Sequence, residues 1–212
     1  DNTATYAAGA GDFSFTGPAN TVNVTFPAGS ADGATQVVNV NINEDVLVEG
    51  TESFSAQLGA ITGPASVNDL TQNITITDNE VAAVEFQIAS SSVGEATTPH
   101  TVVAILDISA VGTGTPALGA AVSVGITQTP NGATTPEDYT LTTTSITFPA
   151  AANDGALQNI DVAIVNDGIT EPDHDFSLGF GTVTGAATAS GTHVVTILDD
   201  DIPGINVTQS GG

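Results

Sequence analysis

The chain has 212 residues with no Lys, Arg or Cys, and its 24 Asp and Glu residues give a formal net charge of −24. A polyanion lacks the basic patches that nucleic acids and anionic membranes require, which excludes both as partners. The absence of Cys excludes disulfides, thiol catalysis and zinc–thiolate sites. An apolar fraction of 40% and a mean hydropathy of +0.19 exclude simple disorder.

The chain repeats itself with an offset of about 121 residues. Residues 26–36 match residues 148–158, and Ile76-Thr-Asp-Asn-Glu80 matches Ile197-Leu-Asp-Asp-Asp201. This offset divides the chain into three parts. We predict that residues 1–80 are a partial repeat that lacks its first strands, that residues 81–201 are a complete repeat, and that residues 202–212 are the first strand of a following repeat.

Two interpretations of the incomplete repeats are open. The chain can be a window on a longer tandem array, or residues 204–212 can donate a strand to the incomplete first repeat of another copy. Donation would supply only the first missing strand, so we favour the array. No apolar run approaches 18 residues, and we therefore expect no direct membrane insertion.

The complete repeat has the alternation and β-branching of short strands, separated by turn residues. We predict strands at 82–90, 101–110, 120–127, 143–148, 157–165, 175–183 and 192–198. Seven short strands without a helical period predict an all-β fold of tandem immunoglobulin-like antiparallel β-sandwiches.

Successive connections in such a sandwich alternate between its two ends, so the acidic loops are expected to converge. One end would gather Glu95, Glu137, Asp138, Asp167, Glu171, Asp173, Asp199, Asp200 and Asp201, whereas the opposite end would hold only Asp154. Crowded carboxylates repel one another unless a cation lies between them. Oxygen ligands favour a hard cation, Ca²⁺ before Mg²⁺.

The complete repeat resembles a Calx-beta domain, the calcium-binding β-sandwich of sodium–calcium exchangers. Four segments carry the resemblance: Val93-Gly-Glu95, Asp138-Tyr139, the acidic loop that ends in Phe176, and Ile197-Leu-Asp-Asp-Asp201. The resemblance covers residues 81–201 fully and residues 1–80 partly.

The resemblance implies a set of calcium ligands in each repeat. In the complete repeat they are Glu95, Asp138, Asp167, Glu171, Asp199, Asp200 and Asp201, with Asn166 where the exchanger domain has a further Asp. In the first repeat they are Asp12, Glu44, Asp45, Glu49, Asp78 and Glu80, with Asn79 in place of one acid. The alternative to metal binding is that these loops are solvated acidic surfaces. We also expect His174 to be a solvated loop residue.

These observations predict a calcium-binding structural module of a secreted or cell-surface repeat protein, forming a stiffened rod, filament or adhesin stalk. The alternatives are a calcium-sensing regulatory domain and a carbohydrate-binding adhesin module. The expected partners are neighbouring repeats of the same chain, other copies in a filament, and a glycan or surface receptor. Catalysis is not expected, because a glycosidase cleft needs aromatic platforms and the chain has no Trp and only 2 Tyr.

Overall fold

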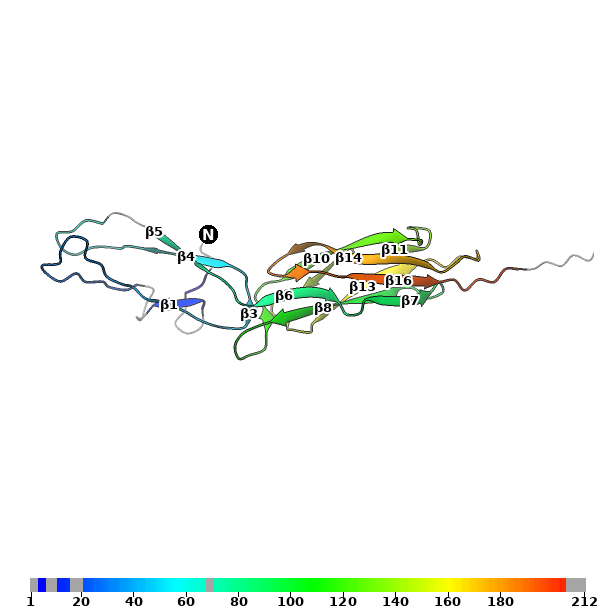
Figure 1. The fold of residues 1–212 in the computed structure, drawn as a ribbon, viewed down its shortest axis with the longest axis horizontal. Helices are drawn as coiled ribbons and strands as arrows, with labels where there is room; N and C mark the ends of the chain where they lie inside the picture. Colours follow the sequence, from blue (N-terminus) through cyan, green and yellow to red (C-terminus); the bar gives the residue numbers. More distant parts are fainter. Residues whose placement is uncertain (1–3, 7–10, 16–20, 68–70, 205–212) are drawn as a thin grey trace, which may run out of the picture. The chain divides into compact units, whose positions relative to one another are not determined.

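The computed structural model of the chain describes residues 4–6, 11–15, 21–67 and 71–204. The chain divides into two compact units. The first comprises residues 1–80 with residues 110–114, and the second comprises residues 81–109 and 115–212. The described residues form strands and turns without helices, which confirms the predicted all-β class (Figure 1). Among them, no helix is long and apolar enough to cross a membrane.

The second unit is a sandwich of two five-stranded sheets (Figure 1). One sheet has the strand order β12-β10-β14-β16-β7 and the other has the order β11-β13-β8-β6-β15. Their bounds are β6 Val81–Phe86, β7 Ser90–Gly94, β8 His100–Ser109, β10 Val122–Asn131, β11 Tyr139–Leu141, β12 Ser145–Phe148, β13 Leu157–Ile164, β14 His174–Thr184, β15 Thr188–Ala189 and β16 Thr192–Leu198, with the short β9 Ala117–Leu118 between β8 and β10.

Alternation along each strand builds the core of this sandwich. In β8 the side chains of Val102, Ala104, Leu106 and Ile108 are buried, while Asp107 between them is exposed. This period of two directs one face of each sheet inward. The inner faces bury Val, Ile, Leu and Phe side chains, and the hydrophobic effect at about 25 cal/mol per Å² of apolar surface holds the two sheets together.

The predicted first strand at 82–90 is wrong in one respect, because it is two strands that belong to different sheets. β6 pairs antiparallel with β8, and β7 pairs parallel with β16. Between them Ile88 and Ala89 bond through their carbonyl oxygens to His193 Nδ1 and Val194 N of the β16 strand. These bonds draw the chain from one sheet to the other. β15 also pairs parallel with β6, so the sandwich is not wholly antiparallel.

The first unit repeats the pairings that lie nearest the acidic loops. Its strands are β1 Phe13–Phe15, β2 Val40–Ile42, β3 Leu47–Val48, β4 Glu52–Gln57 and β5 Thr71–Ile76. Phe13 pairs with Ile42 in β1–β2 as Tyr139 pairs with Ile164 in β11–β13. Glu52 pairs with Ile76 in β4–β5 as His174 pairs with Ile197 in β14–β16. The two units therefore share the backbone register that frames their acidic loops.

The rest of the first unit differs from the second. Residues 21–39 form no strand, although their counterparts contribute β12 and part of β13. Phe26 is 51% exposed and its counterpart Phe148 is 0% exposed, and Val38 is 44% exposed where Ile160 is 0%. In the second unit β12 pairs with β10 and β13 pairs with β8. Among the described residues of the first unit, no strand pairs with these segments as β10 and β8 do in the second.

The predicted strand at 202–212 falls largely outside the described residues, which end at Gly204. Residues 202–204 follow β16 without regular structure.

Candidate metal centres

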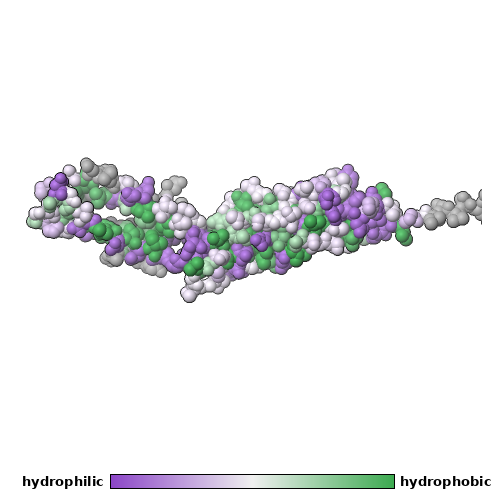
Figure 2. Space-filling model, viewed as in Figure 1, coloured by the Kyte–Doolittle hydropathy of each residue, from purple (hydrophilic) through white to green (hydrophobic). Residues whose placement is uncertain are grey.

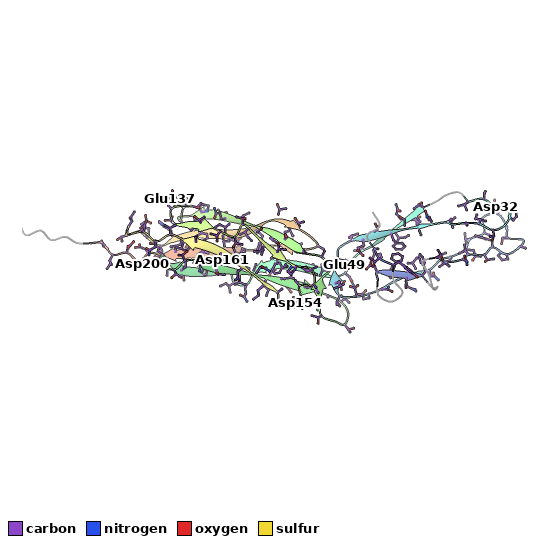
Figure 3. The ribbon with its side chains drawn as sticks, turned by 180° about the vertical axis from the view of Figure 1, so that it is seen from behind. Asp32, Glu49, Glu137, Asp154, Asp161 and Asp200 are labelled. Carbon is purple, nitrogen blue, oxygen red and sulfur yellow. The ribbon has the colours of Figure 1, made fainter. Side chains whose placement is uncertain are left out.

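The acidic loops of the second unit gather at one end of its sandwich, as the strand order predicts. Figure 3 shows Glu137 and Asp200 at this end and Asp154 at the opposite end of the same unit. Glu95 follows β7, Asp138 precedes β11, and Asp199 follows β16. In Figure 2 hydrophilic residues are concentrated at the end of this unit that residues 199–204 leave. We call this end of the sandwich the acidic end and define it by residues 95, 138, 167–174 and 199–201.

Glu95, Asp199 and Asp201 form the first cluster at the acidic end. Each offers a carboxylate oxygen, and these atoms all lie within 4.8 Å of one another. Glu95 is only 9% exposed. Its Oε2 and the Oδ2 of Asp201 are buried atoms without a hydrogen-bond partner among the described residues. A buried carboxylate oxygen without a partner costs free energy, and a bound cation would remove that cost.

The electrostatics of this cluster favour a positive ligand. Burial raises the pKa of Glu95, and the negative charges of Asp199, Asp167, Asp201 and Asp200 raise it further. Burial and three neighbouring Asp residues also raise the pKa of Asp201. The second unit has no Lys or Arg to compensate these charges, since the whole chain lacks both. The cluster therefore needs either protons or a metal ion to reduce its repulsion.

Backbone N–H groups hold the ligand loops in position. Asp199 Oδ2 accepts a hydrogen bond from Glu171 N at 3.2 Å, and Asp199 Oδ1 accepts one from Asp201 N at 3.4 Å. Asp199 N donates to Asp173 Oδ1 at 3.2 Å. In the loop after β13, Asp167 Oδ1 accepts from Ile169 N at 2.7 Å and closes a tight turn. These bonds orient the carboxylates before any ion binds.

Asp138, Glu171 and His174 form a second cluster at the acidic end. Their ligand atoms lie within 4.8 Å of one another, and all three side chains are half-buried. His174 Nδ1 lies 4.0 Å from Glu171 Oε2. The backbone N–H and the hydroxyl of Thr134 donate to Asp138 Oδ2 at 2.5 and 3.1 Å. Because Glu171 N bonds to Asp199, the two clusters are directly connected.

The first unit builds the equivalent of this second cluster from three carboxylates. Asp12, Glu49 and Glu52 offer ligand atoms within 4.8 Å of one another and line a pocket together with Asp45 and Asp78. Figure 3 shows Glu49 at the end of this unit opposite Asp32.

The hydrogen bonds around this pocket repeat those of the second unit. Asp12 Oδ2 accepts from Thr5 as Asp138 accepts from Thr134. Asp45 Oδ1 accepts from Leu47 N at 2.8 Å as Asp167 accepts from Ile169. The two sites therefore have a common backbone design.

Two carboxylates of the first unit have pKa values that are shifted in opposite directions, one by burial and neighbouring charges and the other by hydrogen bonds. Burial, together with the charges of Asp12, Glu52, Asp45 and Asp78, raises the pKa of Glu49 to about 7. Burial also acts on Asp78, but backbone hydrogen bonds from Gly50, Glu49 and Glu80 outweigh it and lower the pKa of Asp78. The negative charge of Asp78 is one of the four that raise the pKa of Glu49, which links the two carboxylates electrostatically.

Several expected ligands have other partners or lie outside the clusters. Glu44 Oε1 accepts from Asn79 Nδ2 at 2.8 Å, and Glu80 Oε1 accepts from Val111 N at 3.1 Å. Asp167 and Asp200 belong to neither cluster of the second unit, although the negative charge of each raises the pKa of Glu95.

Two cluster members were not predicted from the sequence, Glu52 and His174. Both stand two residues before a buried Phe, Phe54 and Phe176, on strands whose side chains alternate. A period of two places each of them on the same face as that Phe. This signal could have identified them.

The donor set determines which ions can bind. The first cluster of the second unit and the pocket of the first unit offer only oxygen atoms, which suit Ca²⁺ and Mg²⁺. The buried oxygens of Glu95 and Asp201, which have no partner within the described part of the chain, fit such an ion. Among the described residues, the Asp138–Glu171–His174 cluster alone combines oxygen with nitrogen.

A model of the Calx-beta domain family matches residues 2–80 and 77–201. Among curated proteins, no sequence matches the chain. Solved structures with a similar fold include the apo form of the Calx CBD1 domain, at 17% identity and a TM-score of 0.47, covering 57% of this chain and 99% of that one. The calcium binding domain CBD12 of CALX1.1 is 18% identical with a TM-score of 0.46, and the match covers 56% of this chain and 44% of that one. The Calx CBD2 domain is 13% identical with a TM-score of 0.44, and the match covers 56% of this chain and 86% of that domain.

Proposed function

Because this chain belongs to the Calx-beta domain family, we propose that it binds Ca²⁺ at the acidic end of the second unit and in the acidic pocket of the first. The observation that carries the proposal is the cluster of Glu95, Asp199 and Asp201, in which two buried oxygens have no hydrogen-bond partner among the residues that the structure describes. Ca²⁺ takes six to eight oxygen ligands, so Asp167 and Asp200 would complete the coordination with Glu95, Asp199 and Asp201.

The proposed role of the metal is structural. Asp78 and Glu80 directly precede Val81, the first residue of β6, and Asp199–Asp201 directly follow β16. An ion held by these residues would order the backbone where the chain passes from one repeat to the next. The protein would then act as a calcium-stiffened rod, filament or adhesin stalk without catalytic activity, and its partners would be neighbouring repeats or further copies of the chain.

We place this module outside the cell or on the cell surface. A chain without Lys or Arg offers no cleavage site to trypsin-like proteases, which suits a protein exposed outside the cell. Extracellular calcium modules bind their ion with dissociation constants of about 10⁻⁴–10⁻³ M, and we expect an affinity in that range here. A calcium-sensing domain would instead bind more tightly and change conformation at lower calcium concentrations.

Calorimetric titration of metal-free protein with CaCl₂ tests the binding. We expect binding that stabilises the second unit by about 2.7 kcal/mol at a 100-fold excess over Kd, because the ligand binds only the folded state. Glu95→Gln and Asp201→Asn should abolish most of this stabilisation. Asp107→Asn, an exposed acid on β8, is the matched control and should leave it unchanged. Equal melting temperatures with calcium and with chelator would refute calcium binding.

Small-angle scattering of the full chain tests the structural role separately. We expect a narrower distribution of intramolecular distances in calcium than in chelator. A chain that binds calcium with the same distribution in both conditions would exclude stiffening and leave a sensor as the better function.

A further inference from the structure

One ligand position differs in chemistry between the two units although its geometry is the same. Glu52 opens β4 and pairs with Ile76, and His174 opens β14 and pairs with Ile197. Each belongs to a cluster with the corresponding Asp and Glu, namely Asp12 with Glu49 and Asp138 with Glu171. The internal repeat thus compares a carboxylate with an imidazole in one structural setting.

The exchange alters both charge and donor type. Three carboxylates give the first cluster a charge of up to −3, whereas two carboxylates and a neutral imidazole give the other −2. Calcium is a hard ion that takes oxygen ligands and gains from each negative charge. Imidazole nitrogen is instead a preferred ligand of Zn²⁺, Cu²⁺ and Ni²⁺.

We propose that Asp138, Glu171 and His174 form a mixed-donor position that selects a transition-metal ion of the Zn²⁺ type over Ca²⁺. The inference rests on the proposed function, in that it assigns a second metal to the same acidic end. Glu95, Asp199 and Asp201 remain the calcium position. The second unit would then carry two chemically distinct ions, and the first unit would take calcium alone at the equivalent place.

The three donors are held by different elements, which is how selective sites are built. The backbone N–H and hydroxyl of Thr134 fix Asp138, the Asp199 carboxylate accepts the Glu171 N–H, and the β14–β16 ladder fixes His174. His174 Nδ1 and Glu171 Oε2 lie 4.0 Å apart. Zinc bonds to His nitrogen and carboxylate oxygen at about 2.0–2.2 Å in tetrahedral geometry, which places two donors about 3.4 Å apart, so these half-buried side chains would move together by about 0.6 Å on binding. A water molecule would supply the remaining coordination.

Titration of the calcium-saturated full chain with ZnCl₂ tests the proposal. We expect one tight zinc equivalent, and a change in the ring ¹⁵N resonances of His174 at that equivalent. His174→Glu should weaken zinc binding by about tenfold or more, since loss of even an outer-shell partner costs about 10–100-fold. The same variant should leave calcium binding at Glu95 intact. His100→Gln removes an imidazole outside the cluster and should leave the zinc affinity unchanged.

The reciprocal variant Glu52→His should create a second zinc equivalent in the first unit. Equal zinc affinity for the parent and His174→Glu, or an equal loss in His100→Gln, would overturn the proposal while calcium binding stands. Zinc binding at His174 in a chain that binds no calcium would overturn the calcium function and leave the mixed-donor position intact. The far-ultraviolet spectrum of His174→Glu should match that of the parent if the variant folds, whereas its melting temperature in chelator should be lower, because a third carboxylate joins Asp138 and Glu171.

Discussion

The rings of Tyr139 and Phe176 stack face to face, with centroids 3.8 Å apart and planes 9° from parallel. Phe13 and Phe54 form the same stack in the first unit, at 3.8 Å and 10°. Each pair joins the residue after a cluster Asp to the strand that carries the third cluster member. The stack therefore fixes the distance between two sides of the metal position, and it does so in both units.

The comparison of the two stacks predicts the effect of removing one hydroxyl group. Tyr139 is fully buried and its hydroxyl has no hydrogen-bond partner among the described residues, whereas the first unit uses Phe13. An unpaired buried polar group costs about 1–3 kcal/mol. We expect Tyr139→Phe to raise the free energy of unfolding of the second unit by about 1 kcal/mol, measured by urea denaturation. A loss of stability of that size would show that the hydroxyl group has a partner.

A repeated motif in opposite environments gives a second prediction. Phe148 lies in the core of the second unit, and its counterpart Phe26 is half exposed in the first. We expect Phe148→Ala to lower the free energy of unfolding by about 3–5 kcal/mol through loss of apolar contact and cavity formation. Phe26→Ala should change it by less than about 1 kcal/mol, as surface substitutions do. Differential scanning calorimetry of both variants measures the two effects, and equal losses would contradict the burial difference.

Much of the second unit follows from sequence pattern, and the exceptions have identifiable causes. β8, β13, β14 and β16 were predicted within two residues because their alternation is regular. The division between β6 and β7 was not, because residues 87–89 contain no Gly or Pro to mark it. That division depends on bonds from the distant residues His193 and Val194, which a local pattern does not contain.

The acidic end could be predicted more fully than its individual ligands. The order of the strands alone brings the loops of Glu95, Asp138 and Asp199 to one end, since successive connections alternate between the two ends of a sandwich. Which side chains meet there depends on rotamers and on backbone bonds such as Glu171 N to Asp199. His174 was predicted to be a solvated residue for this reason, although it lies in a cluster.

A buried chain of hydrogen bonds predicts acid sensitivity in the second unit. His193 is fully buried, its Nδ1 donates to Ile88 O at 2.8 Å, and its Nε2 lies 2.7 Å from the Ser91 hydroxyl. The same hydroxyl lies 2.8 Å from His100 Nε2. These contacts form one hydrogen-bond network. It joins β7, which leads to Glu95, to β8 and β16.

The sign of the pH effect follows from His100. Burial, and then the neighbouring His193, lower the pKa of His100 from its usual 6.5, so the unfolded chain takes up the proton first. The contribution to stability is present above pH 6.5 and is lost as the pH falls through the lowered value. We expect the free energy of unfolding of metal-free protein to fall more between pH 7 and pH 5 than that of His100→Gln, whose amide can replace the hydrogen bond to Ser91 and does not titrate in this range. Parallel curves for the two proteins would contradict this assignment.

Calcium binding in the first unit should release protons near neutral pH. Burial and four neighbouring carboxylates raise the pKa of Glu49 to about 7, so at pH 7 roughly half of the metal-free molecules carry this proton. Because the folded pKa of Glu49 lies above its unfolded value of 4.5, this group contributes stability that is fully present below pH 4.5 and is lost as the pH rises through 7. A bound cation reverses this dependence, since it requires the ionised carboxylate.

We therefore expect the calcium affinity to increase from pH 6 to pH 8, and titration heats at pH 7 to vary with the ionisation enthalpy of the buffer. Glu49→Gln should bind calcium more weakly in this pocket and without that pH dependence, while Asp32→Asn, at the far end of the unit, should behave as the parent. Heats that are the same in phosphate and Tris buffers would exclude linkage between calcium and the Glu49 proton.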